Sequence, residues 1–124
     1  MMQGNVNTNC EAVILVVVNG PNNQKKAVKA VIDTGFTGFL SLPITIINQL
    51  NLPWSYRDRG TLGDGSETIF DIYNATVIWD GQIKDIEVNA ADTEPLIGMS
   101  LLYGYKLQIN TIENGLVIIE SLNQ

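Results

Sequence analysis

The sequence contains no histidine, one cysteine and few basic residues, and each shortage excludes a class of function. Without histidine, the Ser-His and Cys-His pairs of many hydrolases and most zinc sites cannot form. Only 7 basic residues stand against 13 acidic ones, a net charge of -6, which argues against nucleic acid and anionic membranes as partners. Hydrolytic chemistry would therefore have to use carboxylates, hydroxyls or amines.

Cysteine and long apolar runs are also scarce. Cys10 has no second cysteine to pair with, so no disulfide forms within the chain, and this favours an intracellular, cytoplasmic location. The apolar run at residues 12–18 is too short and too rich in β-branched residues for a membrane span or a signal peptide. We interpret this run as a β-strand, and the polar residues 1–11 before it as a loose leader.

The 124 residues, 45% of them hydrophobic, are enough for one domain, which we place at residues 12–124. Short runs rich in Val, Ile, Thr and Tyr alternate with Gly, Asn, Asp and Pro, as is typical of strands and turns. Strands are expected at residues 12–18, 26–33, 39–42, 56–62, 67–72, 75–79, 82–89, 106–110 and 116–120. Asp-Gly and Asn-Gly pairs between them predict tight hairpin turns.

Pro43 and the apolar residues that follow it predict one short helix. A second helical turn is expected after the apolar residues Leu96 and Ile97. The sum is an all-β chain, in which short strands and one or two helical turns form a small closed or folded-over β-barrel.

Asp33-Thr34-Gly35 is the most informative segment. The apolar residues Val31 and Ile32 end a strand, and the strand delivers a carboxylate directly into a turn of small residues. Asp-Thr-Gly is also an ordinary turn sequence, and it occurs by chance in roughly a few per cent of chains this long. The motif follows an apolar strand and precedes another strand and a helix. This position makes it stronger evidence for an active site than the tripeptide alone.

At this segment the chain resembles the retropepsin-like aspartic proteases, whose active-site motif is an apolar pair followed by Asp-Thr/Ser-Gly. Two further motifs agree in order and spacing. The turn at residues 63–66 stands where that family has its flap, and Leu96-Ile97-Gly98 is similar to the motif that leads into the family's C-terminal helix. The resemblance covers about residues 12–121 and implies a β-barrel of the retropepsin type.

The resemblance implies a homodimeric aspartic endopeptidase that cleaves extended peptides between apolar residues and uses no cofactor and no metal. Two carboxylates that share one proton can supply both the base and the acid that peptide hydrolysis needs. The chain has one Asp-Thr-Gly, so Asp33 of a second copy is expected to complete the pair. The other aspartates lack the apolar lead-in and are expected on the solvated surface: Asp58, Asp64, Asp71, Asp80, Asp85 and Asp92.

Roles for the neighbouring residues also follow from the resemblance. Thr34 would hydrogen-bond across the dimer, and Gly35 would let backbone approach the carboxylate and the substrate. Phe36 and Thr37 would line the floor of the cleft. We expect the dimer interface to include Thr34 and the strand at residues 116–121, whose edge would otherwise be left unpaired.

In the flap, the resemblance implies that Gly65 donates backbone hydrogen bonds to a substrate bound as an added strand, with Asp64 and Ser66 beside it. Three apolar residues have implied roles in loop support and subsites that core packing explains equally well: Ile97, Leu62 and Ile69. Many viral members carry an Asp where Thr37 stands and an Arg where Met99 stands. Neither is present here, so the resemblance does not determine the strength of the dimer.

Two other interpretations stay open. A module of this fold that dimerises or binds peptides with little turnover would need no acid at the mouth of its cleft, so Asp33 favours the enzyme. An unrelated small barrel with a chance motif is the third interpretation. Dimerisation, activity at acidic pH and inhibition by a statine-type compound would together identify the enzyme.

Overall fold

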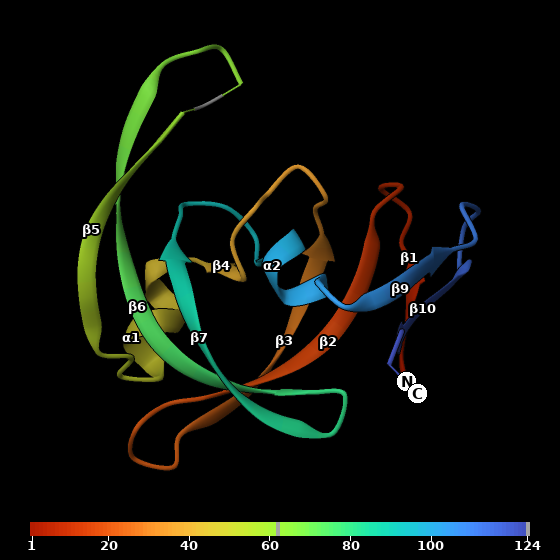
Figure 1. Ribbon diagram of the computed structural model, residues 1–124, viewed down its shortest axis with the longest axis horizontal. Helices are drawn as coiled ribbons and strands as arrows, with labels where there is room; N and C mark the ends of the chain where they lie inside the picture. Colours follow the sequence, from red (N-terminus) through yellow and green to blue (C-terminus); the bar gives the residue numbers. More distant parts are fainter. Residues whose placement is uncertain (62, 124) are drawn as a thin grey trace.

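The computed structural model describes residues 1–61 and 63–123, in which strands predominate and two short helices lie between them (Figure 1). In chain order the elements are β1 (Met2–Val6), β2 (Ala12–Asn19), β3 (Lys25–Ile32), β4 (Leu40–Leu42), α1 (Ile44–Gln49), β5 (Trp54–Thr61), β6 (Glu67–Trp79), β7 (Gln82–Ala90), β8 (Leu96–Ile97), α2 (Met99–Leu102), β9 (Tyr105–Ile109) and β10 (Leu116–Ser121). Within these ranges no helix is long and apolar enough to cross a membrane.

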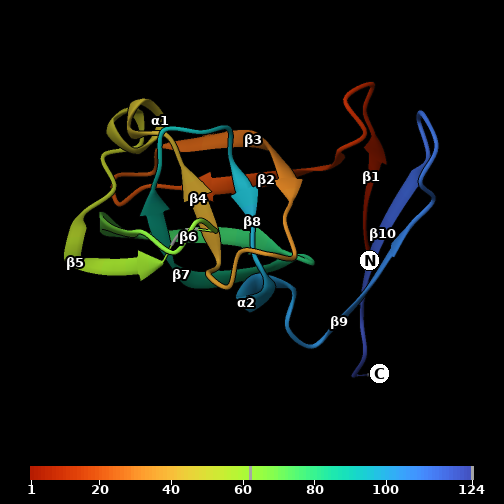
Figure 2. The ribbon, with the colours of Figure 1, turned by 90° about the horizontal axis from the view of Figure 1, so that it is seen from above.

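The strands form one sheet in the order β5-β6-β7-β4-β8-β3-β2-β1-β10-β9. A further antiparallel pairing, which sets Val17 opposite Ile78, joins β2 to β6 and closes the strands between them into a ring. Strand β5 continues from β6 outside this ring, while β1, β10 and β9 form a separate layer at the other end of the molecule (Figure 2). The all-β, folded-over architecture expected from the sequence is confirmed.

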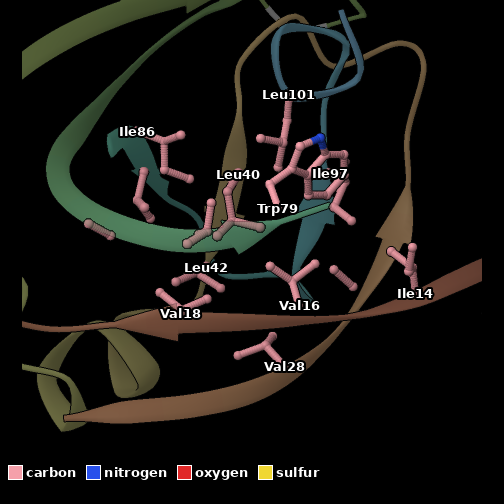
Figure 3. Close-up of a cluster of buried hydrophobic side chains, with 14 of the residues drawn as sticks. Ile14, Val16, Val18, Val28, Leu40, Leu42, Trp79, Ile86, Ile97 and Leu101 are labelled. Carbon is pink, nitrogen blue, oxygen red and sulfur yellow. The ribbon is translucent and has the colours of Figure 1, made fainter. Parts of the chain in front are cut away.

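The core lies inside the ring, because alternate side chains of its strands point inward. In β2, Ile14 and Val16 are buried, whereas Leu15 between them is 54% exposed. Trp79, at the end of β6, is 1% exposed and packs against the Tyr105 ring in a T-shaped arrangement with a centroid distance of 6.0 Å. Figure 3 shows side chains from β2, β4, β7 and β8 around Trp79.

Residues in the turns have the positive φ angles that their residue types accept. Asp80 and Gly81 join β6 to β7 with φ angles of 52° and 77°, and Asn114 has a φ of 61° before β10. Asparagine, aspartate and glycine accept such positive angles better than other residues do. The helix predicted after Pro43 is α1, with Pro43 as its N-cap.

Strand β6 is longer than expected and carries part of the site. Residues 67–72 and 75–79 were expected to be two strands, but Tyr73 and Asn74 between them also pair with β7, so the strand is continuous. Its first half pairs with β5 and leaves the ring as a two-stranded arm that ends in the turn at residues 63–66 (Figure 1).

The N-terminal residues 1–11, expected as a loose leader, instead contribute strand β1. It pairs with β10, where Gln3 lies opposite Ile118, and with β2, where Gly4 lies opposite Ile14. Met2 packs against the core and Val6 is buried, while the main chain of the strand is hydrogen-bonded to two strands. The strand has a single β-branched residue and no aromatic residue, so its composition does not predict a strand.

The pairing of strand β10 differs from what the sequence predicted for residues 116–121. It lies between β1 and β9 and pairs with both, so neither of its edges is open. Within the described residues, the ends of the sheet are β5 and β9 instead. The reason given for a dimer contact along residues 116–121 is therefore wrong, because β1 already occupies the edge that was thought to be unpaired.

Candidate active site

Asp33 immediately follows β3 and is held in place by backbone donors. Ile32 lies opposite Ile97 in the parallel pairing of β3 with β8, and the next amide, that of Asp33, donates to the carbonyl oxygen of Ile97 at 2.9 Å. The Gly35 amide donates to Asp33 Oδ1 at 2.9 Å, and the Phe36 amide donates to the Asp33 carbonyl oxygen at 3.1 Å. The half-buried carboxylate thus has a defined position at the end of a strand.

The start of α2 braces the loop that carries Asp33. The Met99 amide donates to the Phe36 carbonyl oxygen at 2.8 Å, and the Ser100 amide donates to the Gly38 carbonyl oxygen at 3.1 Å. A Cβ atom on Gly98 would lie 2.1 Å from the Gly38 carbonyl oxygen, so this contact requires glycine. The Leu96-Ile97-Gly98 motif therefore supports the loop through backbone contacts.

Thr37 and Met99, the two departures from the viral pattern, lie at the same corner of the loop, and both are exposed. The Thr37 carbonyl oxygen accepts a hydrogen bond from the Ser100 hydroxyl. Backbone and hydroxyl contacts therefore join the loop to α2 at this place. These contacts lie within one chain and leave the side chains of both residues toward solvent.

A cleft of about 970 Å³ opens in front of Asp33. It lies between the loop after β3, both arms of the β5–β6 hairpin, the end of β7 and the loop before β8. Figure 1 shows the hairpin rising on the same side of the molecule as the loop after β3. Four of the site residues predicted from the sequence line this cleft: Asp33, Gly35, Phe36 and Thr37.

The other predicted site residues are not part of the cleft lining. Thr34 is exposed beside Asp33, and Asp64, Gly65 and Ser66 lie beyond the cleft at the exposed tip of the hairpin. Ile69, on the arm, does line the cleft and is 60% exposed. Leu62, to which the resemblance also gave a subsite role, lies outside the described residues.

The hairpin tip is a tight turn stabilised by its own side chains. Asp64 Oδ1 accepts hydrogen bonds from the Ser66 amide at 2.9 Å and from the Ser66 hydroxyl at 2.6 Å. These bonds lower the pKa of the Asp64 carboxyl below its ordinary value, because they favour the charged form. Gly65 has a φ of 87°, as a turn of this type requires.

The cleft also contains acids that sequence reasoning did not place there. Asp58, Asp71 and Asp92 were expected on the solvated surface, and Glu87 on β7 was not considered, yet all four line the cleft. Asp71 Oδ1 accepts hydrogen bonds from Trp54 Nε1 and from Arg57 Nε, both at 3.1 Å, and these lower the pKa of Asp71. No sequence motif marks these four residues, because strand pairing and loop placement bring them together.

Among the described residues, no group of three or more acidic, histidine or cysteine side chains is arranged to hold a metal ion. The polar side chains that line the cleft are carboxylates, hydroxyls, the Arg59 guanidinium and the Asn89 amide.

No protein-family model matches the chain, and neither does a curated protein sequence. Among solved structures, a retropepsin-like aspartic protease from Rickettsia conorii is similar, with a TM-score of 0.63 and 22% identity over 97% of this chain and 89% of that one. The EIAV protease, complexed with the inhibitor HBY-793, has a TM-score of 0.56 and 19% identity over 74% of this chain and 85% of its own. An unrelated small barrel is thereby excluded, and the chain has the fold of the retropepsin-like aspartic proteases.

Proposed function

We propose that the chain is a homodimeric aspartic endopeptidase in which the Asp33 carboxylates of two copies activate a water molecule. The observation that supports it most directly is the position of Asp33. The backbone of the loop holds its carboxylate through the Gly35 amide, at the end of a strand and at the wall of a cleft of about 970 Å³. Clefts of this size are typical of ligand-binding sites.

Two close carboxylates suit peptide hydrolysis because they cannot both ionise cheaply, so one keeps a proton that the other lacks. The ionised carboxylate takes a proton from water, and the protonated one supplies a proton to the scissile peptide. Asp71 of the same chain is a poor partner, since Trp54 and Arg57 donate to its carboxylate and favour its ionised form. A second Asp33, in an identical environment, would share the proton symmetrically.

The β5–β6 hairpin would act as the flap. Gly60 and Thr68, opposite each other on its two arms, already line the cleft. Closure of the arms would bring the amide of Gly65 toward a peptide bound in front of Asp33, and it would exclude bulk water from the reacting groups. The 60% exposed Ile69 would then offer an apolar surface to the substrate.

The test is digestion of a diverse peptide library from acidic to neutral pH, with and without pepstatin, on protein whose mass in solution is measured in parallel. Hydrolysis that is strongest at acidic pH, blocked by pepstatin and confined to the dimer is the expected result. The alternative function, a dimerisation or peptide-binding module with little turnover, predicts bound peptide without cleavage at any pH. That outcome would contradict the enzyme.

A further inference from the structure

Ser41 presents a buried hydroxyl to the cleft. Its residue is 3% exposed, and Ser41 Oγ has no hydrogen-bond partner in the part of the chain that the structure describes. Its neighbours Leu40 and Leu42 are fully buried in the core, so the alternation of β4 turns Ser41 to the other face, where it lines the cleft. A buried hydroxyl without a partner is unfavourable, and a bound polar group would relieve it.

Two further oxygen-bearing side chains share that face. Asn89 lies beside Ser41 in the parallel pairing of β4 with β7, and its Oδ1 atom would be 3.5 Å from a Cβ atom on Gly38. Glu87 precedes Asn89 by two residues and therefore lies on the same face of β7, with its carboxylate accepting a hydrogen bond from the Tyr56 hydroxyl at 2.9 Å. This wall of the cleft is rich in hydrogen-bond acceptors.

The charged side chains that line the cleft are mostly acidic. Of its described lining residues Arg59 is the one basic side chain, and five are acidic: Asp33, Asp58, Asp71, Glu87 and Asp92. Arg59 Nη1 lies 3.8 Å from Glu67 Oε2, and its side chain is 75% exposed, so solvent screens its charge. Arg57 pairs with Asp71, which leaves the other acids uncompensated by an ion pair between described residues. Such a cleft attracts cations and disfavours anions.

We propose that the cleft selects extended peptides that carry a lysine or arginine side chain, which Ser41, Asn89 and Glu87 would hold beside the reacting centre. An ammonium or guanidinium group has only donors, and it matches a wall that offers acceptors. An apolar side chain at this place would leave the Ser41 hydroxyl unpaired. The inference rests on the proposed function for the peptide nature of the ligand, and it adds a basic subsite to the apolar ones expected from the sequence.

The experiment compares three peptides with a reduced, uncleavable central bond that differ at one flanking position, lysine, norleucine or glutamate. Binding to the wild-type protein is measured by fluorescence anisotropy at low and high salt. We expect the lysine peptide to bind about tenfold more tightly than the norleucine peptide, a difference within reach of one charge-assisted hydrogen bond. The glutamate peptide should bind most weakly, and salt should reduce the differences. Equal binding of all three peptides would overturn the proposal.

Single-residue variants test whether Ser41 and Glu87 cause the preference for lysine. Ser41→Ala and Glu87→Gln should each reduce the preference for lysine by several-fold, and Gln can still accept the bond from Tyr56. Asp85→Asn is the matched control, because Asp85 lies on the same strand but does not line this cleft. A Ser41→Ala protein that is at least as stable as wild type and keeps the full preference would also overturn the proposal.

Cleavable versions of the same peptides separate this proposal from the proposed function. Cleavage without preference for lysine would leave the protease standing and overturn the basic subsite. Tight, selective binding of the lysine peptide without cleavage would do the reverse.

Discussion

At the scale of single residues, Asp33 is positioned by its neighbours rather than by contacts that depend on its charge. Its amide is bound to Ile97, its carbonyl oxygen to Phe36, and its Oδ1 atom accepts the Gly35 amide. An amide oxygen can accept the same bond as a carboxylate oxygen. Chemistry and structure at this residue should therefore be separable.

Asp33→Asn should abolish peptide hydrolysis and leave the fold and the dimer intact. The change removes the group that shares the proton but hardly alters the volume of the side chain. Activity should fall to less than about a hundredth of wild type, the scale that general acid–base catalysis contributes. Thermal melting and sedimentation of the same sample check its fold and mass. A variant that retains more activity than this would exclude Asp33 as the catalytic acid.

Glu11 and Glu94 form a second carboxyl pair, remote in sequence. A hydrogen bond between them raises the pKa of Glu94, while hydrogen bonds from Asn7 and Glu94 lower the pKa of Glu11. A carboxyl group whose pKa is raised in the folded state stabilises the fold at pH values below its ordinary pKa of 4.5. This contribution is lost as the pH rises through the pKa in the folded state. The Glu94 proton therefore helps the fold at acidic pH and not at neutral pH.

Glu94→Gln should remove this pH dependence, because an amide donates to Glu11 at every pH. The melting temperature of the variant should exceed that of wild type at neutral pH and approach it at acidic pH. Glu94 is exposed and Glu11 is half-buried, so the effect should be small. Glu113→Gln, in the exposed turn before β10, serves as the control. A difference that is the same at both pH values would show that Glu94 carries no such proton.

At the scale of elements, the outer part of the β5–β6 hairpin buries none of its described residues. No described residue of β5 is buried, and neither are the first five residues of β6. The arm is held by its ladder of backbone hydrogen bonds and, at its base, by Asp71 with Trp54 and Arg57. Elements with few buried contacts open most easily, as a flap must.

Gly65→Val, compared with Gly63→Val, tests whether the hairpin acts in catalysis. A Cβ atom at either glycine would have no atom within 4 Å, but only Gly65 of the two has a positive φ, 87°. The Gly65 variant should therefore lose about 1–2 kcal/mol in turn stability, and the Gly63 variant much less. If the hairpin is a flap, kcat/KM of the Gly65 variant should fall by more than the loss of folded protein explains. Unchanged kinetics on folded, dimeric Gly65→Val protein would contradict a role in catalysis.

At the scale of the whole molecule, one chain presents half of the proposed site. The loop after β3 exposes Thr34 next to Asp33, and both edges of β10 are already paired within the chain. We therefore expect the two copies to meet at the Thr34 loop, with the two Asp33 carboxylates near the two-fold axis. Strand β1 pairs with β2 and β10, so residues 2–6 are part of the sheet.

Thr34→Asp should weaken the dimer, because it places two like charges close to the axis. The dissociation constant measured by sedimentation should rise about tenfold or more, since like-charge contacts at an interface cost several kcal/mol. Activity should fall at low protein concentration and recover at high concentration, which separates weaker association from damaged chemistry. Thr45→Asp, at an exposed position of α1, should change neither property. A strict monomer with full activity would contradict the shared site.

Local sequence was sufficient for the features that depend on local chemistry. Asp80-Gly81 marked a hairpin because few other residues accept its φ angles, Pro43 marked the start of α1, and Asp33-Thr34-Gly35 marked the site because strand, acid and turn are consecutive. These elements were predicted from such patterns, whereas the resemblance to a known family implied the retropepsin fold and the roles of the cleft residues.

Only the tertiary structure decided the features that depend on partners far away in the sequence. The short strand β1 exists because β2 and β10 supply its hydrogen bonds. Ser41 faces the cleft beside Asn89 because β4 and β7 pair in one register, and a shift by one residue would turn Ser41 into the core. The acidic lining of the cleft arises in the same way, since strand pairing and loop placement, rather than any contiguous motif, bring its carboxylates together.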